Sequence, residues 1–149
     1  MPLVYFDSSA LVKLVVQEEG SDLAADLWDS CDAALASRLA YPEVRAALAA
    51  AGRNHDLSND DLDTAEHAWE QYWAAMRPVE LTAAVERHAG QLARSHALRG
   101  ADAVHLASAL APPAPPATAA KTAPIVSESI PDPLAANSWP DLARDSLMQ

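Results

Sequence analysis

Three acidic residues stand at positions where a carboxylate can take part in catalysis. Asp7 ends an apolar run and is followed by two serines, in the segment Val-Tyr-Phe-Asp-Ser-Ser-Ala-Leu. Glu43 falls in the first turn of a predicted helix, and Asp102 stands near the start of a later one. Acidic side chains at the beginning of a helix also cap it or stabilise it electrostatically. Taken singly, none of the three distinguishes a functional site from helix capping.

Carboxylates gathered in one pocket favour a particular chemistry. Hard divalent cations prefer carboxylate oxygens, and Mg²⁺ keeps several of its waters while it contacts phosphate. In phosphodiester hydrolysis such a cation activates water and stabilises the leaving oxygen. Crowded carboxylates repel one another unless a cation lies between them. A shared pocket for Asp7, Glu43 and Asp102 would therefore imply metal-dependent chemistry on a phosphate ester.

The elements that must position these carboxylates alternate between strands and helices. Short apolar runs predict strands at residues 3–6, 33–37 and 77–81, and the first run, which lacks polar alternation, predicts a buried strand. Helical spacing of apolar residues predicts helices that begin near residues 10, 21, 39, 58, 82 and 101. Ser8 or Ser9, Ser21 and Ser58 are predicted caps, and Thr82 is predicted to open a helix. This alternation predicts an α/β fold with a parallel sheet, whose ligands bind beyond the carboxyl ends of the strands.

The composition limits the domain organisation and the kind of partner. The chain has 149 residues, which suits one domain, and its formal net charge is −11. Residues 1–111 are predicted to form the domain core, and 112–149 a divergent segment rich in proline and alanine that completes or trails it. The acidic balance argues against a broad basic surface for nucleic acid. It favours a basic partner or a site for cations.

Several classes of protein are excluded or not expected. Cys31 is the only cysteine, which excludes an intramolecular disulfide and a cysteine-based zinc site. No apolar run approaches the roughly 18 residues needed to cross a bilayer. The N-terminal residues enter the first strand-like run without a basic leader, so a signal peptide is not expected. We therefore expect a cytoplasmic protein without membrane association.

Taken together, the three acidic residues resemble the pattern of PIN-domain ribonucleases, and in particular of the VapC-type toxins of bacterial toxin–antitoxin pairs. The resemblance covers about residues 2–110 and lies in the order of the motifs. A strand-end aspartate precedes two hydroxyl residues, a glutamate lies on a helix, and a late aspartate precedes Ala-Val-His-Leu. The resemblance implies a three-layer α/β/α sandwich with a central parallel sheet and an acidic pocket at its carboxyl edge.

The resemblance also implies roles for individual residues. Asp7, Glu43 and Asp102 would be the catalytic residues, with Asp7 and Asp102 as the main ligands of Mg²⁺ or Mn²⁺. Ser9 would support the site with its hydroxyl. The implied activity is endonucleolytic cleavage of structured RNA, of the transfer or ribosomal class. A cognate VapB-like antitoxin would neutralise the enzyme with a tail that enters the pocket, and homodimers or hetero-oligomers with the antitoxin are expected.

The C-terminal segment departs from the family pattern. Members of the family carry a fourth acidic residue shortly after a fourth strand, usually in a Thr-x-Asp setting. Here the equivalent strand would be residues 123–126, and the candidates for the fourth acid are Glu128 and Asp132, neither of which stands in that setting. An alternative function is therefore a weakened or inactive PIN-like module that binds a basic antitoxin. An unrelated acidic helical adaptor is supported by composition alone.

Arg38, Arg45 and Arg99 flank the acidic motifs and are candidates for contacts to the RNA backbone. The alternative for each arginine is a surface side chain that is solvated or ion-paired. A cation in the acidic pocket would let phosphate approach despite the net charge of −11, because the phosphate would meet the metal rather than bare carboxylates.

Overall fold

The computed structural model describes residues 2–112, which alternate between strands and helices. The elements are β1 (Leu3–Tyr5), α1 (Ser8–Val12), α2 (Ser21–Ser30), β2 (Ala33–Ser37), α3 (Ala40–Arg53), α4 (Asn59–Ala75), β3 (Arg77–Val79), α5 (Ala83–His96) and α6 (Gly100–Leu110). Within this part of the chain no helix is long and apolar enough to cross a membrane. The strand predicted at 123–126, together with Glu128, Asp132 and nearly all of the predicted segment 112–149, lies outside the described residues.

The described strands form one parallel sheet in the order β1–β2–β3. Tyr5 at the end of β1 pairs with Leu35, and Ser37 at the end of β2 pairs with Val79 at the end of β3. The carboxyl ends of all three strands therefore lie at the same edge of the sheet. The predicted α/β fold with a parallel sheet is confirmed.

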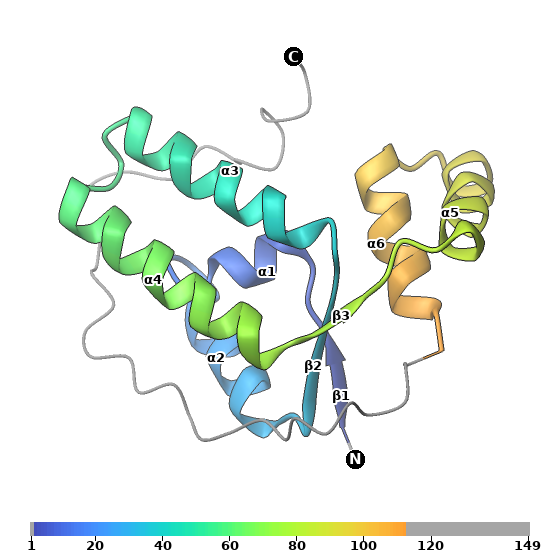
Figure 1. Ribbon diagram of the computed structural model, residues 1–149, viewed down its shortest axis with the longest axis horizontal. Coiled ribbons are helices and arrows are strands. Elements are labelled where there is room, and N and C mark those ends of the chain that lie inside the picture. The colour runs from blue at the N-terminus through green and yellow to red at the C-terminus, as the bar shows by residue number, and fades with distance from the viewer. Residues whose placement is uncertain (1, 113–149) are drawn as a thin grey trace.

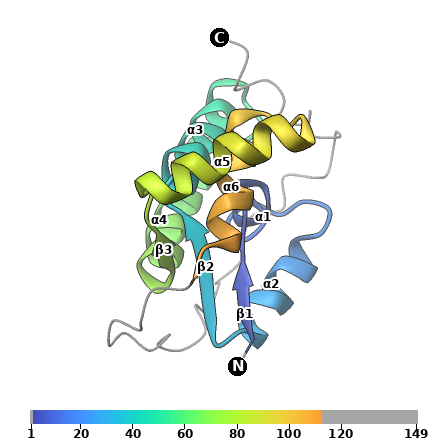
Figure 2. The same ribbon diagram turned by 90° about the vertical axis from the view of Figure 1, so that its right-hand side faces the viewer.

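Helices cover both faces of this sheet (Figure 1). One layer contains α1, α2, α3 and α4, and the other contains α5 and α6. Figure 2 shows α5 and α6 in front of the strands, with α5 outermost. The two helical layers and the sheet make up the three layers of an α/β/α sandwich.

Two separate groups of apolar side chains hold the layers together. The larger group packs α1 to α4 against the sheet, and its largest fully buried side chains include Trp69, Leu11 and Leu48. The smaller group lies between α5 and α6 and is centred on Val85, Ala89, Ala103 and Ala107. Because α5 and α6 have their own small core, their position relative to the other layer depends on further contacts.

Three local predictions are wrong. β1 is not buried throughout, since Leu3 is 45% exposed and Val4 and Tyr5 are half-buried. β1 lies at an edge of the described sheet, so it lacks the two flanking strands that a central parallel strand has. The first helix begins at Ser8, and its cap is Asp7, whose Oδ1 accepts a hydrogen bond from the N–H of Ala10. An aspartate caps a helix about as well as a serine. Ser21 is not a cap either, because it is the first residue of α2 and follows Gly20, which has no side chain to cap the helix.

Leu11 on α1 is fully buried in the larger core. We predict that Leu11→Ala lowers the free energy of unfolding by about 2–5 kcal/mol, because the substitution removes buried methyl groups and leaves a cavity. Urea denaturation followed by tryptophan fluorescence measures this loss. Leu23 on α2 is the matched control, since its side chain is 63% exposed. Leu23→Ala should change the same quantity by less than about 0.5 kcal/mol, and equal losses would contradict the packing.

Candidate active site

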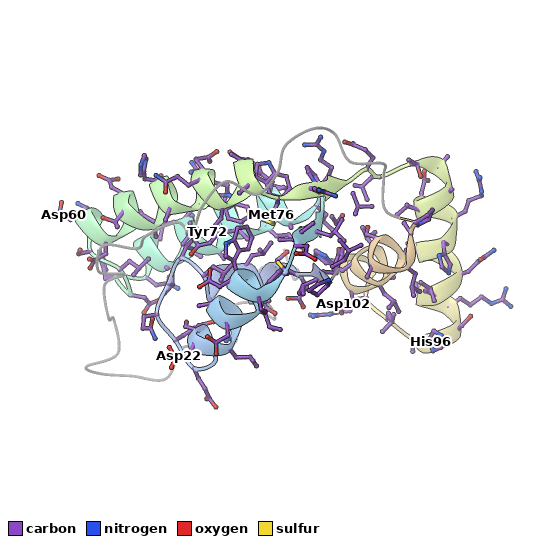
Figure 3. All side chains as sticks on the ribbon, turned by 90° about the horizontal axis from the view of Figure 1, so that it is seen from below. Asp22, Asp60, Tyr72, Met76, His96 and Asp102 are labelled. Atoms are coloured by element: carbon purple, nitrogen blue, oxygen red, sulfur yellow. The ribbon has the colours of Figure 1, made fainter. Side chains whose placement is uncertain are left out.

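The candidate site lies where the carboxyl edge of the sheet meets the N-terminal turns of three helices. Asp7 follows β1 and caps α1, while Glu43 and Asp102 stand in the first turns of α3 and α6. An acidic side chain is favourable at a helix N-terminus because the helix dipole is positive there. Figure 3 shows Asp102 on the side of α6 that faces away from α5. Local folding thus brings the three predicted catalytic residues to one end of the sandwich.

The carboxylate of Glu43 accepts hydrogen bonds from two other helices. Nε2 of His105, on α6, lies 2.6 Å from Glu43 Oε2. The hydroxyl of Ser8, on α1, donates to the same oxygen and lies 3.2 Å from His105 Nε2. Hydrogen bonds to an ionised carboxylate are about twice as strong as neutral ones. Glu43 therefore ties α1, α3 and α6 together at the edge of the sheet.

The other side of the His105 ring contacts the strands. The Tyr5 hydroxyl, at the end of β1, lies 3.0 Å from His105 Nδ1 and accepts a hydrogen bond of 3.1 Å from the backbone N–H of Ser37. All of these groups are satisfied when His105 carries its hydrogen on Nε2 and Tyr5 donates to Nδ1, since the carboxylate of Glu43 can only accept. A continuous network therefore runs from β2 through β1 and α6 to α3.

This network differs from the serine–histidine–acid relay of hydrolases. In that relay the serine and the acid contact opposite nitrogens of the histidine ring. Here Ser8 and Glu43 both contact Nε2, and Nδ1 is occupied by Tyr5. His105 is therefore arranged to orient Glu43 and not to activate Ser8.

Asp7 and Asp102 each use one carboxylate oxygen in a local contact. Asp7 Oδ1 accepts hydrogen bonds of 2.9 Å from the Ser9 hydroxyl and from the N–H of Ala10. Asp102 Oδ2 lies 3.1 Å from Arg99 Nε. Within residues 2–112, no hydrogen bond or ion pair reaches Asp7 Oδ2, Asp102 Oδ1 or Glu43 Oε1. Each of the three acidic residues thus has one oxygen without a partner among the described residues.

The described residues do not by themselves complete a metal site. No group of three or more His, Cys, Asp or Glu side chains suited to a metal ion is present among residues 2–112. The charges of Asp7 and Glu43 both act on the Tyr5 hydroxyl, and Asp102 stands one turn before His105, which contacts Glu43. Carboxylate oxygens are the donors that hard divalent cations prefer, so the chemistry of the set fits Mg²⁺ or Mn²⁺.

The three arginines predicted to contact RNA all form ion pairs. Arg38 lies 2.7 Å from Glu80, and Arg99 lies 3.1 Å from Asp102. Arg45 approaches two acidic residues of α4 at 3.6 and 3.7 Å. Exposed ion pairs of this kind contribute little to stability, so a phosphate can replace the carboxylate. Their contact with RNA stays a prediction.

Sequence reasoning missed Tyr5, Ser8 and His105 as members of the site. One signal was present, because His105 stands three residues after Asp102 and side chains at this spacing share one side of a helix. The contact that places His105 in the site is a tertiary one. α6 packs beside β2, and this contact brings His105 to Glu43.

Comparison with known proteins defines the class of this fold and site. Residues 4–114 match the family model of the PIN domain, and the chain belongs to that family. Two relatives are Ribonuclease VapC45 from Mycobacterium tuberculosis (strain CDC 1551 / Oshkosh) and Ribonuclease VapC49 from Mycobacterium tuberculosis (strain ATCC 25618 / H37Rv). Each is 76% identical to this chain over 111 residues, which is 74% of this chain and 77% of the relative. The resemblance to VapC-type PIN-domain proteins is confirmed.

Burial raises the pKa of Tyr5 from its usual value of 10.0 to about 12. The hydrogen bond from Ser37 opposes this shift, and the negative charges of Asp7 and Glu43 add to it. The folded protein therefore holds this proton more tightly than the unfolded chain does. The resulting stability is fully present below pH 10 and is lost as the pH rises toward 12.

We predict that Tyr5→Phe removes this part of the alkaline transition. In a spectrophotometric titration of tyrosinate absorbance, the natural protein should show a phenol that ionises near pH 12, and the variant should lack it. The free energy of unfolding of the variant should also fall less steeply between pH 10 and 12. Identical titration curves for the two proteins would show that Tyr5 is not buried in the network.

Proposed function

We propose that the protein is a metal-dependent endoribonuclease toxin that cleaves phosphodiester bonds of structured RNA, of the transfer or ribosomal class. The observation that carries this proposal is the placement of Asp7, Glu43 and Asp102, each with one oxygen available, beyond the carboxyl edge of a parallel sheet. Ligands of such sheets bind there. The names of both relatives, which are ribonucleases, support RNA as the substrate.

The proposed cofactor is Mg²⁺ or Mn²⁺, held by Asp7 and Asp102 with Glu43 beside them. A divalent ion supplies activation of water and stabilisation of charge on the phosphate. Glu128 or Asp132 is the proposed fourth acid. A cation held by these carboxylates would supply positive charge, and this charge would allow a phosphate backbone to bind to an acidic protein.

Each proposed ligand is oriented by neighbours that leave its second oxygen open. Ser9 fixes Asp7, and Arg99 contacts Asp102. His105 and Ser8 together hold one oxygen of Glu43. Hydrogen bonds that orient metal-binding side chains set the angle at which the ligand is presented. This is the contribution of the chain itself to the reaction.

The proposed partner is a cognate VapB-like antitoxin with a basic or arginine-bearing tail. A positively charged tail complements a chain of net charge −11 and the exposed carboxylates of Asp7 and Asp102. Such a tail would occupy the place of the cation and block the site. A cytoplasmic location is part of this proposal, because structured RNA is found there.

A second candidate function is a PIN-like binding module that does not cleave RNA and serves as a docking protein for the antitoxin. The specific observation in its favour is that residues 2–112 contain no group of three metal-ligating side chains. Retained antitoxin binding, with no cleavage of transfer or ribosomal RNA in Mg²⁺ or Mn²⁺, would support this candidate over the nuclease.

The first test is cleavage of bulk transfer and ribosomal RNA in the presence of Mg²⁺ or Mn²⁺. We predict cleavage that stops in excess chelator and falls more than about 100-fold in Asp7→Asn, because a ligand matters at least as much as the groups that orient it. Asparagine caps a helix as well as aspartate does, so α1 should stay intact. Asp26→Asn on α2, also exposed, is the matched control. Cleavage that survives chelation or Asp7→Asn would refute the proposal.

The second test concerns His105. We predict that His105→Ala lowers kcat about 10–100-fold and leaves the KM for RNA nearly unchanged, because Glu43 loses the donor that orients it. His105→Gln should recover part of kcat, since its amide can donate to Glu43. Single-turnover cleavage measures the rate, and thermal unfolding shows that both variants are folded. Equal rates for the alanine and glutamine variants would mean that His105 has only a structural role.

A further inference from the structure

The charge of the described residues is divided unevenly along the chain. Residues 77–99, which include β3 and α5, carry four arginines and two acidic residues. The other described residues, 2–76 and 100–112, carry four lysines and arginines and 15 acidic residues. The sandwich therefore has one basic region in an otherwise acidic molecule.

The basic region has a solvent-facing side on α5. Val85 and Ala89 of this helix pack against α6, whereas Arg87 and Arg94 are exposed. Helical periodicity places both arginines opposite the packed face. They stand seven residues apart, which is two turns and about 10 Å along the helix axis. Gln91, also exposed, lies between them.

Arg87 and Arg94 are not neutralised by neighbouring acids. In the part of the chain that the structure describes, no carboxylate lies within ion-pair distance of either side chain. Arg38, Arg45 and Arg99 differ in this respect, since each is ion-paired. An unpaired guanidinium keeps its planar set of N–H donors, which matches the geometry of phosphate.

The connection after α5 leads to the first turn of α6, which carries a residue of the candidate site. α5 ends at His96, which Figure 3 labels at the tip of the helix, and α6 begins at Gly100 with Asp102 in its first turn. Arg94 thus lies near the end of α5 that leads to the site, and Arg87 lies two turns farther from it. Along α5, Arg94 therefore lies closer than Arg87 to the connection that leads to Asp102.

We propose that the α5 basic face, defined as Arg87, Gln91 and Arg94, binds the phosphate backbone of the RNA substrate on one side of the bond that is cleaved. This inference rests on the proposed ribonuclease function. Contacts to phosphate position a nucleic acid without reading its sequence, and folded RNA is recognised largely through its shape and backbone. Since the rest of the described molecule is acidic, the α5 basic face is the surface that a polyanion can follow.

The test is the equilibrium binding of bulk transfer RNA to the full chain carrying Asp7→Asn, measured by fluorescence anisotropy at several salt concentrations. Arg87→Ala and Arg94→Ala should each weaken RNA binding about threefold or more, with effects that add in the double variant. Each should reduce the slope of log affinity against log salt by about 0.7–0.9, because one phosphate contact is lost. In the cleavage-competent chain the same variants should raise KM and leave kcat unchanged.

Arg53→Ala is the matched control, because Arg53 ends α3, is exposed, and has no ion pair within residues 2–112. It removes the same charge at a different place, so RNA affinity and salt slope should stay as in the parent chain. Equal weakening by Arg53→Ala, or unchanged binding in both α5 variants, would overturn the inference. Polyglutamate, a model of an acidic protein, serves as a second probe. If Arg87→Ala and Arg94→Ala lose polyglutamate binding but keep RNA binding, the face binds an acidic protein, and the inference is overturned as well.

The two proposals fail in distinguishable ways. Normal metal-dependent cleavage by the natural chain, together with unchanged RNA affinity in the α5 variants, rejects the α5 basic face alone. RNA binding that depends on Arg87 and Arg94, without any cleavage by the natural chain, rejects the nuclease and supports the α5 basic face as an RNA-binding surface.

Discussion

The hydrogen bond between Glu43 and His105 joins helices from opposite sides of the sheet. α3 belongs to the layer that packs into the larger core, and α6 belongs to the layer that shares a small core with α5. The bond is short, 2.6 Å, and its side chains are only 25% and 11% exposed, so water competes with it weakly. The position of Asp102 on α6 relative to Asp7 on α1 depends on this contact, because Ser8 completes the link to α1.

A role at a helix N-terminus does not prevent an acidic residue of this protein from binding a ligand as well. Asp7 satisfies a backbone N–H of α1 with Oδ1 and leaves Oδ2 without a partner among the described residues. Glu43 and Asp102 likewise stand in first helical turns and each use one oxygen internally. A carboxylate has two acceptor atoms, so one atom can serve the fold while the other serves a ligand. The preference for acidic side chains at helix N-termini therefore also gathers negative charge at the edge of the sheet.

Local patterns predicted the elements well, and tertiary contacts explain the errors. The strand expected at 33–37 coincides with β2, Ser58 caps α4 as expected, and α5 follows Thr82, which was expected to open a helix. Leu3 is exposed where β1 forms an edge of the described sheet, and no local pattern records that position. The sequence alone did not assign His105 to the site, because its partner Glu43 is 62 residues away in the chain and only the packing of α6 reveals the contact.

The most direct measurement is anomalous diffraction from crystals of the full chain grown with Mn²⁺. The central claim is that Asp7, Glu43 and Asp102, from three different elements, share one divalent ion. We expect an anomalous peak within about 2.5 Å of oxygens of both Asp7 and Asp102, with Glu43 contacting it directly or through a water. A peak bound elsewhere, or none at saturating Mn²⁺, would contradict the claim.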